Sequence, residues 1–266
     1  MNFDAAIATK WLDQAAIGLP GLPQILHKTT SEVLIIGAGV FDIYFTQGWI
    51  PAFKRKTGDL DLSVGIFSGE SDYEVMKTAI LAEGYTNSDQ VSYRFFSPKQ
   101  ILGGLTYLDL LAHPAKQSIS AEFTRSVMGA GPDFSFEGFE LARTCAFKID
   151  EKLSFPNPIS MVGLKRAAYL DNPEKRVKDL ADIAELSWGI VEKGTHFEMS
   201  ELWEKIKSQP EAKIIRATLL ELGSSRSVKW DLENARQELL KRNFSGSEID
   251  DLLPERMLEW ASYMPI

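Results

Sequence analysis

The sequence predicts an α/β fold of the α+β kind, in which a small mixed sheet with flanking helices is followed by an all-helical C-terminal half. Two observations lead to this fold class. In the front half, short apolar runs typical of strands alternate with helical patterns. From residue 157 onward, the spacing of apolar residues is helical to the end of the chain. The Phe-Pro-Asn-Pro stretch at 155–158 marks the boundary, which gives predicted domains of residues 1–153 and 154–266.

The first elements are predicted from apolar spacing and from turn residues. Residues 4–28 have a helical pattern that is interrupted at 18–21 by glycine and proline. An apolar run at 31–37 ends in glycines and predicts a buried strand, with a helix over 40–47 packed on it. A strand is expected at 58–67, where acids and apolar residues alternate before the run becomes wholly apolar.

The remainder of the front half predicts one helix and two strands. The helix begins at Ser71, an N-cap residue with a glutamate three positions later as its capping-box partner. Strands are expected at 91–97 and 105–112, and Gly103-Gly104 suits a hairpin between them. The stretch 129–139, rich in Gly and Phe, is expected to be a loop with a short strand. Breaks at Pro and Gly residues divide the back half into predicted helices at 158–171, 174–192, 199–208, 210–222, 229–242 and 246–262.

Composition limits the classes of protein to which the chain can belong. The 266 residues are 44% hydrophobic and 25% charged, which is typical of a globular protein. No apolar run approaches the roughly 20 residues that cross a bilayer. The N-terminus contains acids and lacks the apolar core of a secretory signal. We therefore expect a soluble, cytoplasmic protein with no membrane partner.

The counts of cysteine, histidine and charged residues restrict the chemistry further. With one cysteine, Cys145, and three histidines, neither an intrachain disulfide nor a cysteine- or histidine-based zinc centre is expected. A metal would be held by carboxylates, which select hard ions such as Mg²⁺ or Mn²⁺. The net charge of −8 argues against tight non-specific nucleic-acid binding. It still allows a nucleotide in a pocket, or an RNA end on a local basic patch such as 54–56 or 165–178.

The strand expected at 58–67 opens with the motif Gly-Asp-Leu-Asp-Leu. Side chains alternate between the two faces of a strand, so Asp59 and Asp61 project together while Leu60 and Leu62 point into the core. Two adjacent carboxylates repel each other unless a cation lies between them. The motif is also typical of a solvated edge strand with its acids outward, and by itself it favours that interpretation.

Two further features favour a cation site. Asp109 is an acid within a second apolar strand, and a buried acid is costly unless it is paired or bound to a metal. The turn Gly37-Ala38-Gly39 follows the first strand, where glycines let the backbone approach a ligand and the next helix directs its amides at phosphate. This turn also nearly matches the dinucleotide-binding fingerprint, but Asp42 replaces its last glycine and repeated βαβ units do not follow.

The order of these motifs along the chain resembles that of the DNA polymerase β-type nucleotidyltransferase superfamily. The pattern of that superfamily is an apolar strand, a glycine pair, a helix, two spaced acids and a later third acid. Within it, the chain looks most like the bacterial AbiEii and MenT-type toxin group, in which a basic residue and a threonine precede the acids, as in Arg55-Lys56-Thr57. The resemblance covers roughly residues 31–190. It implies a nucleotidyltransferase-type sheet, with Mg²⁺ or Mn²⁺ on Asp59, Asp61 and Asp109, which would also be catalytic.

The same group has a downstream helical signature, here Lys165 followed by Lys178-Asp179 and then Asp182. The resemblance implies that Lys165 contacts the nucleotide phosphates, and that Asp179 is a catalytic acid that orients Lys165 or the substrate. The nucleotide contacts that it implies come from Gly37, Ala38, Gly39, Arg55, Thr57 and Lys165. Without the resemblance, Lys165 would be interpreted as a surface lysine, and the two acids as helix-surface partners of Lys175 and Lys178 at i, i+4.

The implied reaction moves a nucleoside monophosphate from an NTP to an acceptor hydroxyl. Three function classes remain open. The first is a toxin-like transferase acting on RNA, such as the 3′ end of tRNA, with an antitoxin protein as partner. The second is a transferase acting on a small molecule or a protein. The third is a non-catalytic relative that binds a partner through its helical half; the complete set of three acids argues against it, while the acidic net charge weakens the first class.

Overall fold

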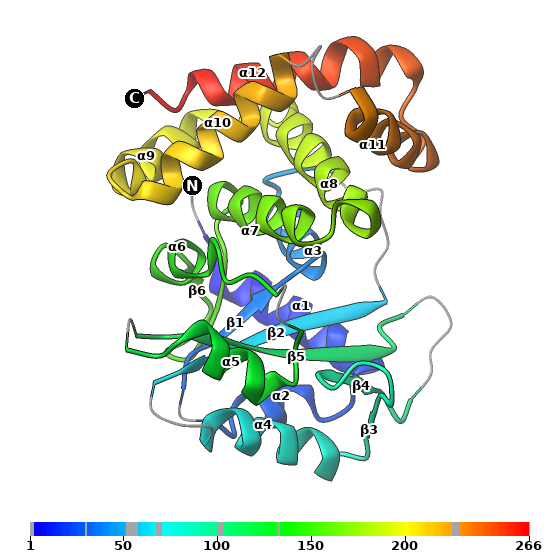
Figure 1. The fold of residues 1–266 in the computed structure, drawn as a ribbon, viewed down its shortest axis with the longest axis vertical. Coiled ribbons are helices and arrows are strands. Elements are labelled where there is room, and N and C mark those ends of the chain that lie inside the picture. The colour runs from blue at the N-terminus through cyan, green and yellow to red at the C-terminus, as the bar shows by residue number, and fades with distance from the viewer. Residues whose placement is uncertain are drawn as a thin grey trace.

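The computed structural model of this chain describes residues 3–29, 31–51, 58–67, 71–99, 104–116, 118–131, 134–224 and 229–265. In these residues the chain forms a seven-stranded mixed sheet surrounded by helices (Figure 1). Among the described residues, none of the helices combines the length and the apolar character that a membrane crossing requires.

The strands form the sheet in the order β3-β4-β5-β2-β1-β7-β6. Their bounds are β1 Val33–Ile36, β2 Asp59–Ile66, β3 Thr86–Asn87, β4 Arg94–Phe96, β5 Tyr107–Pro114, β6 Phe147–Lys148 and β7 Leu153–Phe155. The central strand β2 pairs antiparallel with β1 and parallel with β5, and β5 in turn pairs antiparallel with β4. Because β2 has a neighbour on each side, the interpretation of Asp59 and Asp61 as acids on a solvated edge strand is wrong.

Helices lie on both sides of this sheet and then continue to the C-terminus. Their bounds are α1 Ala5–Gly18, α2 Leu22–Leu26, α3 Gly39–Thr46, α4 Ser71–Ala82, α5 Ala121–Met128, α6 Phe139–Thr144, α7 Pro158–Asp171, α8 Pro173–Glu192, α9 His196–Ile206, α10 Pro210–Ser224, α11 Lys229–Lys241 and α12 Leu253–Ser262. A short π-helical turn precedes α12. In Figure 1, α4 lies below the sheet, while α7 and α8 lie between the sheet and the group formed by α9 to α12.

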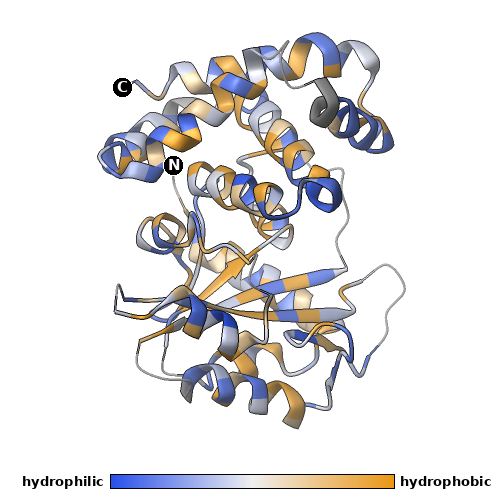
Figure 2. Ribbon diagram, viewed as in Figure 1, coloured by the Kyte–Doolittle hydropathy of each residue, from blue (hydrophilic) through white to orange (hydrophobic). Residues whose placement is uncertain are grey.

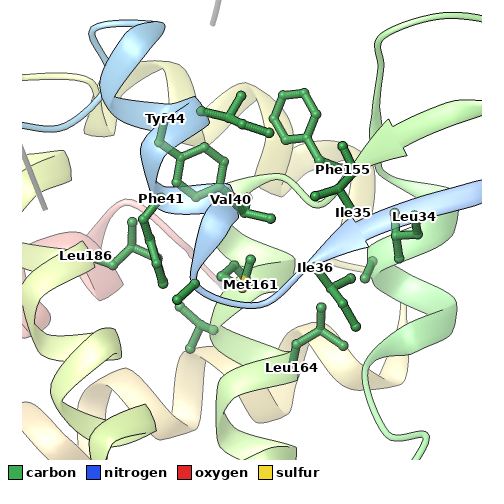
Figure 3. Close-up of a cluster of buried hydrophobic side chains, with 14 of the residues drawn as sticks. Leu34, Ile35, Ile36, Val40, Phe41, Tyr44, Phe155, Met161, Leu164 and Leu186 are labelled. Carbon is green, nitrogen blue, oxygen red and sulfur yellow. The ribbon is translucent and has the colours of Figure 1, made fainter. Parts of the chain in front are cut away.

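The core beside the sheet is formed by β1, α3, β7 and the two helices α7 and α8. Strand β1 is the sequence Val-Leu-Ile-Ile and is buried on both faces, as a strand inside a sheet with helices against it must be. Figure 2 shows β1 as hydrophobic along its length, whereas β2 and β5 include hydrophilic segments. Figure 3 shows Val40, Phe41 and Tyr44 of α3 beside Phe155 of β7 and Met161 of α7. This packing fixes α7 and α8 against the end of β1.

The connection from β7 to α7 is also fixed by hydrogen bonds. Asn157 is fully buried, and its side-chain oxygen accepts a hydrogen bond from the Ser160 amide at 3.0 Å, which caps the first turn of α7. Its side-chain amide donates to the Cys145 carbonyl at 2.9 Å. The Tyr44 hydroxyl donates to the Pro156 carbonyl at 2.7 Å and ties α3 to the same connection. The direction in which α7 leaves the sheet is therefore set by side chains.

Most of the long elements lie where the sequence predicts them. The strands expected at 31–37, 58–67 and 105–112 are confirmed as β1, β2 and β5, and the helical pattern over 4–28 is confirmed as α1 and α2 with its break at 18–21. The expected strand at 91–97 is shorter, because β4 covers three residues. Among the described residues, β7 is the last strand and helices α7 to α12 follow it. The division into two domains at 153/154 stays a prediction.

Short elements were missed. The sequence analysis did not identify α5, α6, β3, β6 or β7, each of eight residues or fewer. The described part of 129–139 contains no strand, and its last residue begins α6. Isolated helices of this length are marginal in water, so it is contact with the rest of the fold that stabilises them. Gly103 of the expected hairpin lies outside the described residues, as do Arg55 and Thr57.

Replacement of the Asn157 cap should destabilise the protein more than replacement of an exposed cap. Asn157→Ala removes the cap of α7 and leaves the Cys145 carbonyl without its amide donor, which together cost about 2 to 4 kcal/mol. The control is Ser120→Ala, because Ser120 is exposed, caps α5 through the Phe123 amide, and should cost about 1 kcal/mol. Urea unfolding monitored by circular dichroism measures both values. Equal losses would show that the second hydrogen bond of Asn157 contributes nothing.

Candidate active site

Three carboxylates gather where β2 and β5 run side by side. The parallel pairing places Asp61 opposite Asp109 and Asp59 opposite Tyr107. Asp59 and Asp61 are two positions apart and share a face of β2, and the register puts Asp109 on that same face. One carboxylate oxygen from each acid lies within 4.8 Å of the others, and this cluster could hold a metal ion. The sequence prediction that these three acids converge is therefore confirmed.

The turn after β1 closes directly over Asp61. Gly37 has a φ of +75°, and a Cβ added to it would lie 1.7 Å from an Asp61 carboxylate oxygen. Side chains other than hydrogen are therefore excluded there, both by the backbone conformation and by the carboxylate. Gly39 differs, since an added Cβ would meet Leu60 and Trp11 at ordinary distances of about 3.5 Å, toward the core. Gly37 and Ala38 line the cavity described below, and Gly39 is not part of that lining.

An arginine that the sequence analysis did not consider binds the third acid. Arg94 of β4 lies opposite Asp109 in the antiparallel register and donates to both of its carboxylate oxygens, at 2.8 and 2.7 Å. The Arg94 guanidinium carbon lies 4.1 Å from the centre of the Tyr107 ring. The Tyr107 hydroxyl donates to Asp59 at 3.3 Å. Arg94 and Tyr107 thus form a chain of contacts that links Asp109 to Asp59.

The protonation of these acids reflects their crowding. Burial raises the pKa of Asp61 to about 8, with further increases from the charges of Asp59 and Asp109, while Lys165 and Arg176 act in the opposite direction. Burial also raises the pKa of Asp109, an effect that the Arg94 ion pair reduces without cancelling. With a pKa of about 8, Asp61 holds its proton at neutral pH unless a cation replaces that proton. The cluster therefore favours either a proton on Asp61 or a bound cation.

Lys165 supplies positive charge from α7, facing the acids. It is buried, and its Nζ lies 2.8 Å from Asp179 and 2.6 Å from Asp182, both of α8. Arg176 approaches the same Asp179 at 3.6 Å. The interpretation of Lys165 as a surface lysine is therefore wrong, and Asp179 and Asp182, exposed by 1% and 0%, are not helix-surface acids. The Asp179 carboxylate lies 2.8 Å from the Lys165 Nζ, and the role of Asp179 as a catalytic acid that orients Lys165 or the substrate stays a prediction.

The ion pairs continue away from the acids into the C-terminal helices. Asp182 also lies 2.8 Å from Arg242, the residue that follows α11. Arg242 is buried, pairs with Glu185 at 3.0 Å, and donates to the Lys178 backbone carbonyl at 3.1 Å. We call Lys165, Asp179, Asp182, Glu185 and Arg242 the buried charge network. Arg242 was missed because its partners Glu185 and Lys178 lie 57 and 64 residues away along the chain.

The three acids, Arg94, Lys165 and Asp179 line one cavity of about 440 Å³, a size typical of small-molecule sites. Its base is the acid cluster, and its opposite wall comes from α7 and α8. The cationic side chains that line it are Arg94, Lys165, Lys175, Arg176 and Lys178, and the aromatic ones are Tyr93, Tyr107, Phe134 and Phe139. The cavity therefore combines the acid cluster with cationic side chains from α7 and α8, and its lining also includes Glu137, Asp171 and Asp179.

Replacement of Gly37 should be far more costly than replacement of Gly39. In Gly37→Ala the left-handed backbone alone costs about 1 to 3 kcal/mol, and the new methyl group displaces the Asp61 carboxylate. Gly39→Ala, at the start of α3, should be neutral or stabilising by up to about 1 kcal/mol. Urea unfolding and Mn²⁺ binding measure the two effects. Similar results for both alanine variants would contradict the close approach of Gly37 to Asp61.

The raised pKa of Asp61 predicts a pH-dependent stability in metal-free buffer. The folded protein holds the Asp61 proton up to about pH 8, whereas the unfolded chain releases it near an ordinary carboxyl pKa of about 4. Stability should therefore fall as pH rises from about 4 to about 8, by at most about 1.4 kcal/mol per pH unit from this group. In Asp61→Asn this contribution is absent.

The measurement is urea unfolding of both proteins at pH 6, 7 and 8 in EDTA and again in Mg²⁺. The stability advantage of Asp61→Asn should grow with pH in EDTA. It should disappear when Mg²⁺ compensates the wild-type carboxylates, because an ion that binds the folded state alone stabilises it. Parallel pH profiles in EDTA would rule out a raised pKa at Asp61.

Comparisons with known proteins gave no match. Neither protein-family models, nor curated proteins, nor solved structures matched this chain. The resemblance to the DNA polymerase β-type superfamily therefore depends on the residues and their order. The function must be argued from the chemistry of the cavity itself.

Proposed function

We propose that this protein is a metal-dependent nucleotidyltransferase that moves a nucleoside monophosphate from an NTP to an acceptor hydroxyl. A single observation supports the proposal most: three clustered carboxylates face a cationic wall across one cavity. Acids that bind a divalent ion, placed opposite groups that bind phosphate, are what a metal–triphosphate ligand requires. The mixed sheet, with its first two acids on β2 and the third on β5, is consistent with a nucleotidyltransferase-type sheet.

The ion that we propose is Mg²⁺, with Mn²⁺ as the alternative. All three candidate ligands are carboxylates, which hard divalent ions prefer over softer metals. Their mutual repulsion, seen in the raised pKa of Asp61, is relieved by such an ion. When bound to Asp59, Asp61 and Asp109, Mg²⁺ supplies charge stabilisation for the reacting phosphate.

The chain's own cations bind and orient the remaining phosphates. Lys165, held by Asp179 and Asp182, presents a fixed positive charge to the cavity, and Arg176 adds a second. Lys175, Arg176 and Lys178 lie in the first two turns of α8, where the helix dipole disfavours positive side chains. A bound anion makes that placement favourable. At the other end, Gly37 and Ala38 offer backbone without bulk, and Gly39, Arg55 and Thr57 remain proposed contacts from the resemblance alone.

The acceptor that we propose is RNA, with the 3′ end of tRNA as the leading candidate and an antitoxin protein as regulator, in keeping with the toxin group that the sequence resembles. The cationic residues at the start of α8 border the cavity, so an RNA end could contact them beside the nucleotide. Arg176 is 44% exposed, which leaves part of its side chain accessible to such a partner. A hydroxyl on a small molecule or a protein is the competing acceptor.

Label transfer tests both the reaction and the acceptor. Purified protein is incubated with Mg²⁺, each α-³²P-labelled NTP, and total RNA, total protein or a small-molecule extract. Asp61→Asn should lower transfer by about 10³-fold or more, the size of effect that charge stabilisation has in phosphoryl transfer. RNA labelling should also fall steeply with salt, because backbone contacts are electrostatic.

The control is Asp150→Asn, which removes an acid that binds the backbone amides of Lys152 and Leu153 and does not line the cavity. Its transfer rate should equal that of the unmodified protein. If protein or a small molecule is labelled and RNA is not, the proposed RNA acceptor is wrong and the proposed transferase reaction stands. Full activity in Asp61→Asn, or no labelled product with any NTP and acceptor, would overturn the proposed reaction.

A further inference from the structure

The pairing of Arg94 with Asp109 conflicts with the use of Asp109 as a metal ligand. Both oxygens of this carboxylate accept hydrogen bonds from Arg94, at 2.8 and 2.7 Å. One oxygen of the same group also belongs to the cluster of atoms within 4.8 Å that could hold a cation. A guanidinium and a divalent ion on one carboxylate repel each other, so each weakens the binding of the other. Arg94 therefore competes with a metal ion for Asp109, the third carboxylate of the cluster.

We propose that Arg94 exchanges between Asp109 and the phosphates of a bound polyphosphate, so that phosphate binding releases Asp109 to the metal ion. The inference rests on the proposed function, and it adds a mechanism by which phosphate and metal binding are coupled. Arg94 is the residue that carries the coupling. The metal site is complete only when the phosphate ligand is present.

The position of Arg94 allows this exchange. Its side chain is 29% exposed and lines the cavity, whereas its partner Asp109 is only 7% exposed. The guanidinium lies on the Tyr107 ring, and that ring is fixed by the hydrogen bond of its hydroxyl to Asp59. A planar cation can slide or rotate on an aromatic face while it keeps the cation–π contact. The ring therefore supports the guanidinium while it moves from Asp109 to a phosphate group within the cavity that all three residues line.

The chemistry of Arg94 favours the exchange when phosphate arrives. A guanidinium binds phosphate through two parallel hydrogen bonds, as it binds a carboxylate. Phosphate carries more negative charge than one carboxylate, so it attracts the guanidinium more strongly. Once Arg94 has left Asp109, both oxygens of that carboxylate are available to a metal ion. Lys165 differs in this respect because two buried carboxylates hold its Nζ. Arg94 combines a partly exposed side chain with a direct contact to the acid cluster.

The first experiment measures Mn²⁺ binding to metal-free protein by electron paramagnetic resonance, without phosphate. Arg94→Gln should bind Mn²⁺ about tenfold more tightly, the size expected when a competing ion pair worth about 1.4 kcal/mol is removed. Arg94→Lys should lie between the two, since lysine keeps the charge and loses the two-point contact. Asp61→Asn should bind Mn²⁺ weakly, which identifies the site.

The matched control is Arg236→Gln. Arg236 also donates to two oxygens of one aspartate, Asp250, at 2.9 and 3.0 Å, but it lies outside the cavity. Its Mn²⁺ affinity should be unchanged. Circular dichroism and urea unfolding confirm that each variant is folded before binding is compared.

The second experiment measures binding of inorganic tripolyphosphate in EDTA by calorimetry. Arg94→Gln should weaken it about tenfold, and Arg236→Gln should leave it unchanged. Tighter Mn²⁺ binding together with weaker tripolyphosphate binding supports the exchange. Unchanged or weaker Mn²⁺ binding in Arg94→Gln overturns it, as does unchanged tripolyphosphate binding. If Arg94→Gln changes both affinities as expected but no nucleoside monophosphate is transferred from any NTP, the exchange stands and the proposed reaction fails.

Discussion

The in-register parallel pairing of β2 with β5 is the constraint on which the rest of the site depends. It brings three carboxylates within 4.8 Å of one another on one face of a buried sheet. The acids cannot move apart unless a whole strand shifts by two residues, which would also displace the apolar side chains between them. Their repulsion must therefore be met by positive charge. Arg94 supplies it from the neighbouring strand, and Lys165 and Arg176 supply it across the cavity.

The buried charge network extends this requirement to the C-terminal helices. It contains two cations, Lys165 and Arg242, and three acids, Asp179, Asp182 and Glu185. At its margins, Arg176 approaches Asp179 at 3.6 Å and Glu238 approaches Arg242 at 3.5 Å. Removing one member of such a network leaves an uncompensated buried charge, which is strongly destabilising. Residues after α11 thus help to set the position of the lysine that faces the acids, although they lie outside the cavity lining.

Much of the fold and of the acid cluster could be predicted because both depend on local periodicity. The two-residue period of a strand put Asp59 and Asp61 on one face, and an acid within an apolar run indicated Asp109. Lys165 was selected by the resemblance alone. Arg94 could not be predicted, since its role depends on the register of β4 against β5. Arg242 could not be predicted either, because its partners are distant along the chain.

By itself, the sequence determined the apolar strands, the positions of the long helices, the turn at Gly37 and the acids that repel one another. These features follow from side-chain size, backbone freedom and charge at each position. Only the tertiary structure decided that the acids lie on a central strand, that Lys165 is buried, and that Arg94 occupies Asp109. The reason is physical. Register and long-range ion pairing arise from the packing of whole elements, and the spacing of residues along the chain does not encode them.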